Sequence, residues 1–117
     1  MLENDAFVIT DLDTAYKEIV AKPFDAIISP DMYEIDDAYF QNLYSFIDYC
    51  SDSCNRIWGR IYVILDTLRD TPLKFHLYRE NPKEEETKAT YSELMELHKE
   101  MLNLLSQLYS KTKNVKL

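Results

Sequence analysis

The sequence predicts a mainly α-helical fold, a bundle built on a long central helix (or helix pair) and an antiparallel C-terminal helix. Apolar residues recur three or four positions apart over residues 36–69 and 91–109, a spacing that places them on one face of a helix. The 117 residues include one glycine, whereas the tight turns of a many-stranded sheet usually need glycine or asparagine. A chain of this length can bury a core as one domain, which we place at residues 1–110, with a basic C-terminal tail at 111–117.

The N-terminal segment predicts a small β-α-β-like unit that covers one end of the bundle. Residues 6–9 and 24–29 are short apolar runs typical of strands. Between them, the apolar residues of 12–20 share one helical face. Pro23 restricts the residue before it, so this helix should end near Ala21.

The longest apolar stripe lies between Asp36 and Arg69, a stretch without proline. It predicts a helix with Asp36 as its N-terminal cap. The members of the stripe are Phe40, Leu43, Ile47, Cys50, Cys54, Ile57, Ile61, Leu65 and Leu68. Residues 51–53 (Ser-Asp-Ser) compete for backbone hydrogen bonds, so the alternative is a pair of helices that divides there.

Beyond this stripe, Thr71-Pro72 should end the helix, and the alternation of apolar and polar residues over 73–78 predicts a short strand or extended arm. Residues 80–89 are expected to form a charged loop. Thr90 and Glu93 match a capping box that opens the last helix, predicted over 91–109. A central stripe longer than its partner helix would leave apolar surface, which favours a homodimer.

Cys50 and Cys54 lie four residues apart on the stripe, where a disulfide would strain a helix. They are expected to be reduced and to pack as small apolar side chains. A zinc site that combines them with His76 and His98 is the alternative, but their spacings fit no familiar zinc motif. We therefore expect no metal and no cofactor.

Several functional classes lack support in the sequence. No apolar run approaches the ~20 residues of a membrane span, and the acidic N-terminus is unlike a signal peptide, so we expect no membrane association and a cytoplasmic location. The sequence contains no glycine-rich phosphate loop, no nucleophile elbow and no HExxH motif.

The charge is unevenly distributed. Residues 1–54 contain twelve acidic and two basic residues, whereas the remainder contains nine acidic and eleven basic residues. Such an acidic half argues against direct nucleic-acid binding, which requires lysine and arginine for the phosphates, and it is compatible with a basic protein partner. The candidate partner-binding residues combine carboxylates with nearby tyrosines: Asp31, Tyr33, Glu34, Asp36, Asp37, Tyr39, Asp48 and Asp52.

These observations predict a small acidic protein–protein interaction protein without enzymatic activity. A sharper version is an inhibitor or adaptor of the kind that phages and mobile elements use, which would bind a basic nucleic-acid-handling protein. The alternative for the acidic residues is an ordinary solvated surface, with Asp36 and Asp37 serving the helix N-terminus. A purely structural homo-oligomer is a further alternative.

One short pattern points to a different class. Arg69, His76 and Tyr78 form R-x6-H-x-Y, which resembles the catalytic signature of HEPN ribonucleases, small helical proteins that dimerise to bring two such motifs together. The resemblance implies that Arg69 stabilises phosphate charge and that His76 serves acid–base chemistry. Asp70 matches the polar residue that follows the arginine in that family. Pro72 departs from the family pattern, which places the motif at a continuous helix.

Overall fold

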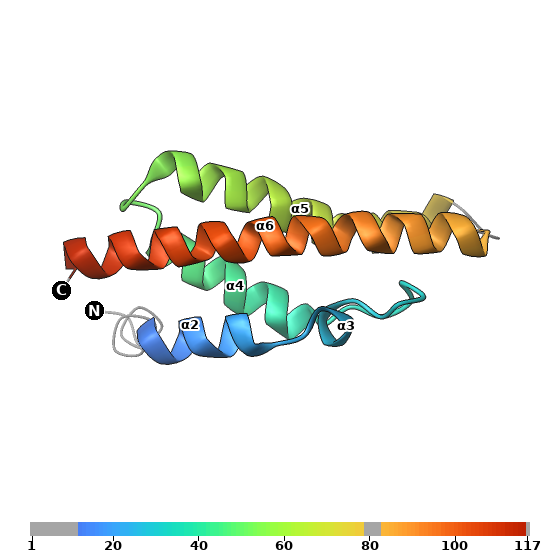
Figure 1. Cartoon of the computed structure of the whole chain (residues 1–117), viewed down its shortest axis with the longest axis horizontal. Coiled ribbons are helices and arrows are strands. Elements are labelled where there is room, and N and C mark those ends of the chain that lie inside the picture. Colours follow the sequence, from blue (N-terminus) through green and yellow to red (C-terminus); the bar gives the residue numbers. More distant parts are fainter. Residues whose placement is uncertain (1–11, 79–82, 117) are drawn as a thin grey trace.

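The computed structural model describes residues 12–78 and 83–116, and within these ranges the fold is mainly α-helical, as predicted (Figure 1). The helices are α2 (Leu12–Ala21), α3 (Phe24–Ile27), α4 (Asp37–Tyr49), α5 (Asn55–Tyr78) and α6 (Glu84–Lys116). The described residues form no sheet. Ile28 and Ile35 pair in an isolated antiparallel β-bridge.

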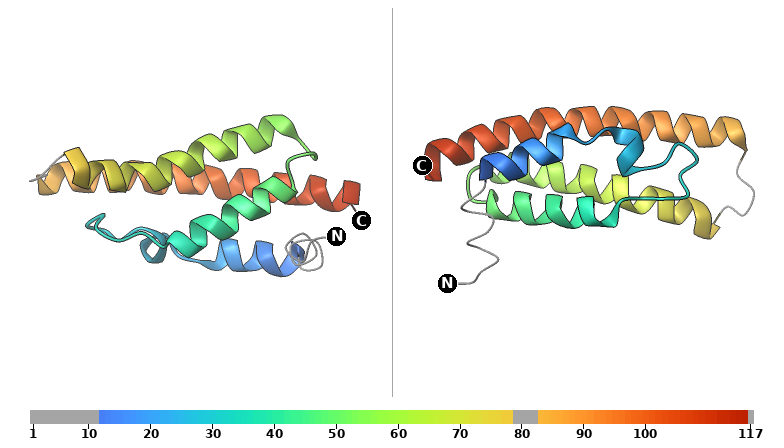
Figure 2. Two further views of the ribbon diagram at one scale, coloured as in Figure 1. Left: turned by 180° about the vertical axis from the view of Figure 1, so that it is seen from behind. Right: turned by 90° about the horizontal axis from the view of Figure 1, so that it is seen from below.

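Successive long helices run in opposite directions, so that α2, α4, α5 and α6 form an up-and-down bundle (Figures 1 and 2). Helix α5 packs along α6, α4 packs on α5, and α2 packs on α4. The rings of Tyr16 on α2 and Tyr109 on α6 stack with centroids 4.0 Å apart, which joins the first helix to the last. The predicted helical bundle is confirmed, and α5, one of the two helices of the central pair, packs antiparallel against the C-terminal helix α6.

The central stripe is divided between two helices. Helix α4 ends at Tyr49 and α5 begins at Asn55, so the single long helix was wrong and the helix pair is correct. The backbone amide of Ser53 donates to the Cys50 carbonyl at 3.0 Å, which forms part of the turn between the helices. The stripe residues are buried, apart from the half-buried Cys54, because the turn folds both halves onto the same core.

Helix α5 continues through Pro72 to Tyr78, so the predicted end at Thr71-Pro72 and the predicted strand over 73–78 were wrong. The buried face of α5 continues past the proline, since it includes Leu68, Pro72 and Phe75, which are spaced four and three residues apart as on one side of a helix. Leu73, which the two-residue alternation grouped with Phe75, is 45% exposed. Tertiary packing therefore outweighs the ~3 kcal/mol that proline costs inside a helix.

The last helix begins earlier than predicted. Helix α6 starts at Glu84, inside the segment that we expected to be a loop, and its first turn contains Glu84, Glu85 and Glu86. Negative side chains are favourable there because they face the positive end of the helix dipole. The Thr90 hydroxyl donates to the Glu86 carbonyl at 2.9 Å, so Thr90 lies within the helix and does not cap it.

The basic C-terminal segment is helical as far as Lys116, because α6 continues beyond the predicted boundary at residue 110. Thr112 is buried in this segment. Its hydroxyl lies 2.8 Å from both the Leu108 carbonyl and the Ser53 hydroxyl, which links the end of α6 to the α4–α5 turn. The structure thus extends the bundle through most of residues 111–117.

Of the two predicted N-terminal elements that fall within the described residues, the helix is confirmed and the strand over 24–29 is not. Helix α2 ends at Ala21, as the position of Pro23 predicted. Residues 24–27 form the short helix α3 in place of a strand, because Phe24 and Ile27 are three positions apart and both are buried. The strand predicted over residues 6–9 lies outside the described residues.

His98 gives the bundle a specific pH dependence. This side chain on α6 is 6% exposed, its ring lies 5.1 Å from the Phe24 ring, and burial lowers its pKa from 6.5. The unfolded chain therefore binds a proton at this position more readily than the folded chain. We expect the free energy of unfolding to fall as the pH decreases through about 6.5 and to level off below the folded pKa.

Urea denaturation at a series of pH values tests this expectation, with His98→Leu as the comparison. The difference between the two stability profiles isolates the histidine, because paired carboxylates such as Asp36, whose pKa is lowered from 3.8, lose their contribution only at lower pH. Parallel profiles between pH 8 and pH 5 would contradict the assignment to His98.

Candidate functional site: the acidic end of the bundle

The α3–α4 loop, defined as residues 28–36, projects from the bundle as a narrow turn (Figures 1 and 2). Ile28 and Ile35 form an antiparallel bridge at its base. Asp31, Tyr33 and Glu34 are exposed at its tip, and Tyr33 is the most exposed of the large apolar side chains described, at 68%. The loop thus presents an aromatic ring to solvent between two carboxylates.

Hydrogen bonds to Ser29 fix the path of this loop. The Ser29 amide donates to the Glu34 carbonyl at 3.0 Å, and the Met32 amide donates to the Ser29 carbonyl at 2.8 Å. The Ser29 hydroxyl donates to Asp31 Oδ1 at 2.6 Å and accepts from the Glu34 amide at 3.1 Å. Asp31 Oδ1 also accepts from the Tyr33 amide at 3.1 Å. The Asp31 carboxylate therefore holds the backbone of its own loop.

Met32 anchors the tip of the loop in the core. Its side chain is fully buried, with 0% exposure, although its neighbours Asp31 and Tyr33 are exposed. Its φ of 62° lies in the left-handed region, which is unfavourable for residues other than glycine. Burial of the Met32 side chain offsets the cost of this backbone conformation and ties the tip of the loop to the core.

The N-terminus of α4 continues the acidic surface. Asp36 is the N-cap, as predicted, and its carboxylate accepts from the Tyr39 amide at 3.1 Å. It also forms an ion pair with Lys22, which together with the amide hydrogen bond lowers the pKa of Asp36. Asp37 is exposed in the first helical turn. Asp36 thus has a structural role, whereas Asp37 lies on the surface beside the loop.

The remaining predicted surface residues lie elsewhere. Tyr39 is 4% exposed, its ring is 5.6 Å from the Phe40 ring, and burial raises its pKa, so its side chain belongs to the core. Asp48 and Asp52 are exposed near the α4–α5 turn, at the other end of α4 and thus about 18 Å away along the helix. The structure brings together Asp31, Tyr33, Glu34 and Asp37 but not Asp48 and Asp52.

Sequence reasoning missed other carboxylates at this end of the molecule. The start of α6, with residues 84–86, lies at the same end of the bundle as the α3–α4 loop (Figures 1 and 2). Asp25, in the first turn of α3, is also exposed. The run of glutamates was visible in the sequence, but its position depends on α5 and α6 being antiparallel and on α6 starting at Glu84.

The residues of the R-x6-H-x-Y pattern lie on α5. Arg69 and His76 are seven residues apart on this helix, which corresponds to two turns and about 10 Å along the axis. The Arg69 guanidinium lies 5.8 Å from the centroid of the Tyr44 ring. The Tyr44 hydroxyl donates to Asp66 at 2.5 Å, and burial together with this bond raises the pKa of Tyr44 to about 12. The side chains of His76 and Tyr78 lie outside the described residues.

Cys50 and Cys54 flank the α4–α5 turn and are not joined by a disulfide; the first is buried and the second half-buried. His98 lies against Phe24 of α3. Across residues 12–78 and 83–116 the structure contains no group of three or more histidine, cysteine or acidic residues that could hold a metal ion. The zinc alternative also required His76, whose side chain is outside the description.

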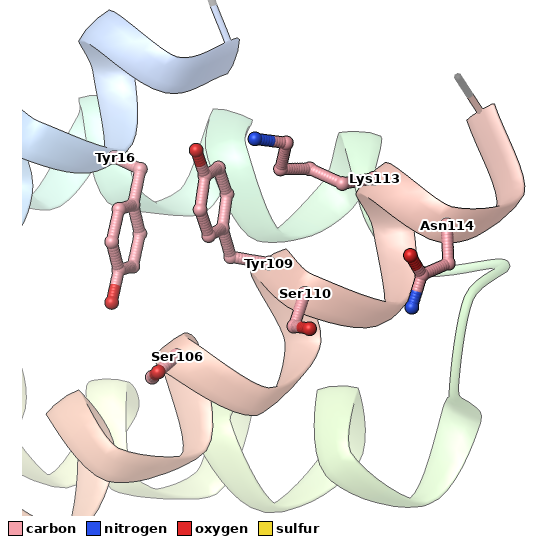
Figure 3. A pocket seen from close by; sticks show the side chains of 6 residues that line it. All are labelled: Tyr16, Ser106, Tyr109, Ser110, Lys113 and Asn114. Atoms are coloured by element: carbon pink, nitrogen blue, oxygen red, sulfur yellow. The ribbon is translucent and has the colours of Figure 1, made fainter.

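An open groove lies between α2 and the C-terminal part of α6, lined by Tyr16, Tyr109 and Lys113 with nearby serine and asparagine side chains (Figure 3). The stacked tyrosines point their hydroxyl groups in opposite directions. Tyr109 donates a hydrogen bond to Asp13, and Lys113 lies 3.5 Å from the same carboxylate. The polar groups of the groove thus hold α2 against α6, which is a structural role.

None of the helices in the described part of the chain combines the length and the apolar character that a bilayer span requires. Comparisons of the chain with models of protein families, with curated proteins and with solved structures find no match.

Proposed function

We propose that the chain is a protein–protein interaction protein that binds a basic partner through the acidic end of its bundle. The observation that carries this proposal is the 68% exposure of Tyr33 on a loop fixed by hydrogen bonds and by the buried Met32. Tyrosine is rigid and amphipathic, and it is enriched among the residues that dominate binding energy at interfaces. A preorganised loop also loses little conformational entropy on binding.

The charge around Tyr33 defines the kind of partner. Glu34 and Asp37 are exposed near it, and Asp25 and residues 84–86 lie at the same end of the bundle. Complementary charge accelerates association and selects against acidic partners. The sharper proposal is an inhibitor or adaptor, of the kind that phages use, that occupies the basic surface of a nucleic-acid-handling protein.

Charge reversal at this end of the bundle tests the proposal. We expect Glu34→Lys combined with Asp37→Lys to reduce capture of the partner by at least tenfold in quantitative affinity purification, because like charges then face each other across the interface. Binding of the unmodified chain should also weaken as the salt concentration rises. Asp36 and Asp31 are left intact, since they hold the α4 cap and the loop.

The matched control is Asp48→Lys combined with Asp52→Lys, which makes the same change in charge at the other end of α4. A protein captured by the unmodified chain and by this control, but lost with the Glu34 and Asp37 variant, supports the proposal. Equal loss with both double variants, or capture that neither of them changes, rejects it. Circular dichroism establishes that both variants remain helical.

A ribonuclease of the HEPN kind is a second candidate, and the continuity of α5 through Pro72 favours it. Residues seven positions apart on a continuous helix, as Arg69 and His76 are on α5, lie two turns apart on one side of its axis. The contact of Arg69 with Tyr44 is an equally good structural explanation for the arginine. Cleavage of single-stranded RNA by the purified chain, abolished in His76→Ala, would support this candidate, and the absence of cleavage would remove it.

A homodimer is a separate proposal about partners. The reason given by the sequence, a central stripe longer than its partner helix, does not hold, because α6 is the longest described helix and the stripe is buried. Any self-association therefore needs another surface.

A further inference from the structure

The outer face of α5, defined as Arg56, Gly59, Arg60, Val63, Asp66 and Asp70, lies opposite the side that contacts the core. Gly59, Arg60 and Asp66 each lie three or four residues from Val63, and Arg56 and Asp70 each lie seven residues from it, so all of them share one side of the helix. Val63 lies at the centre of this face and is 56% exposed, whereas Ile61, Ile64 and Leu65 are buried. An exposed β-branched apolar residue thus occupies the middle of a long helix.

Gly59 lies one turn before Val63, and no contact among the described residues requires a glycine at this position. Apart from its chain neighbours and the backbone of its own helix, no described atom lies within 4 Å of a methyl group added to its Cα, and its backbone does not have a positive φ. Glycine inside a helix costs roughly 0.5–1 kcal/mol relative to alanine. Because Gly59 has no side chain, another helix can approach the α5 backbone closely next to Val63.

The charges of the outer face are arranged symmetrically about Val63. Arg56 and Asp70 lie seven residues before and after it, and Arg60 and Asp66 lie three residues before and after it. In an antiparallel pair of α5 helices with a two-fold axis at Val63, Arg56 of each copy faces the partner's Asp70, about 10 Å from the axis. The face is therefore complementary to itself in both charge and direction.

The pair of charges nearer to Val63, Arg60 and Asp66, differs from the pair farther from it, Arg56 and Asp70, in its contacts within the chain. Arg60 already forms two hydrogen bonds with Glu100 of α6, at 2.8 and 2.9 Å, and Asp66 accepts from Tyr44. Arg56 and Asp70 form no ion pair in the part of the chain that the structure describes. The outer charges can thus pair with a second copy without breaking a bond in the first.

We propose that two copies of this chain associate through the outer face of α5, antiparallel, with Val63 on the two-fold axis and Arg56 paired with the partner's Asp70. This proposal names the surface of the homodimer and does not depend on the acidic end of the bundle. Val63 and Gly59 form the apolar centre of the interface, and the Arg56 and Asp70 pairs fix the antiparallel direction.

Sedimentation velocity over a range of chain concentrations tests the association. We expect the unmodified chain to form a dimer and Val63→Glu to sediment as a monomer with unchanged helical content, since Val63 is exposed in the single chain. Tyr33→Ala should leave the dimer intact, which separates this proposal from partner binding. An unmodified chain that stays monomeric up to about 1 mM would overturn the proposal.

A charge swap tests the orientation. Arg56→Glu alone and Asp70→Arg alone should each raise the dimer dissociation constant about tenfold, because each creates two like-charge contacts in a symmetric dimer. The double variant, Arg56→Glu with Asp70→Arg, should restore the original constant. Lys99→Glu, on the exposed side of α6, is the control and should have little effect. A double variant as weak as the single ones would overturn the antiparallel arrangement.

Discussion

Truncation of Leu65 to alanine should lower the free energy of unfolding by about 2–5 kcal/mol. Leu65 has 0% exposure on α5, the helix that packs against both α4 and α6. Removal of its side chain loses the transfer free energy of the deleted carbons and leaves a cavity, which close-packed neighbours cannot fill. Urea denaturation monitored by circular dichroism measures the difference.

Leu73→Ala is the matched control for this prediction. It makes the same chemical change on the same helix, but Leu73 is 45% exposed and its loss should cost well under 2 kcal/mol. Similar losses for the two variants would contradict the assignment of Leu65 to the core. A much larger loss of unfolding free energy in Leu73→Ala than in Leu65→Ala would mean that the side of α5 that faces α6 has been identified wrongly.

Tyr33→Ala should weaken partner binding by about 2 kcal/mol, or roughly thirtyfold in the dissociation constant. The ring is 68% exposed in the single chain, so its removal should leave the stability of the bundle almost unchanged. Titration calorimetry with the partner isolated by affinity purification measures the binding change, and thermal denaturation measures the stability.

Tyr33→Phe separates the contribution of the ring from that of the hydroxyl group. It should bind almost as tightly as the unmodified chain if burial of the ring dominates, and should match Tyr33→Ala if a hydrogen bond of the hydroxyl dominates. Unchanged affinity in both variants would contradict the role of Tyr33. Lowered stability in Tyr33→Ala would point to a structural role for the ring.

The sequence was sufficient to predict the helices that carry a regular apolar stripe. The spacing of Phe40, Leu43 and Ile47, and later of Leu105 and Leu108, requires a helix because the stripe must be buried along its whole length. Asp36 was also identifiable as a cap, because aspartate before an apolar run accepts the free amides of the first turn. These features depend on residues close together in the sequence.

The errors arose where distant contacts outweigh local preferences. Pro72 usually ends a helix, but burial of Phe75 beyond it keeps α5 helical. The charged residues 84–86 resemble a loop in isolation, and they become the first turn of α6 because α6 packs along α5. Short segments such as 24–27 carry too few residues to distinguish a strand from a helical turn.

The candidate site was only partly predictable for the same reason. The composition identified the acidic half and its tyrosines, but not which of them are exposed. Tyr33 and Tyr39 occur in similar acidic contexts, yet the first is 68% exposed and the second 4%. That difference follows from the anchoring of Met32 and from the turn that Ser29 and Asp31 stabilise, neither of which has a distinctive sequence pattern.

Site-specific photo-crosslinking gives the most direct test of the proposed binding surface. A photoreactive phenylalanine derivative is placed at position 33 in one variant and at position 48, at the other end of α4, in a second. The account predicts a crosslink from position 33 to a basic segment of the captured partner, and little or none from position 48. A crosslink from position 48 alone would contradict it, because the partner would then contact the α4–α5 turn and not the acidic end.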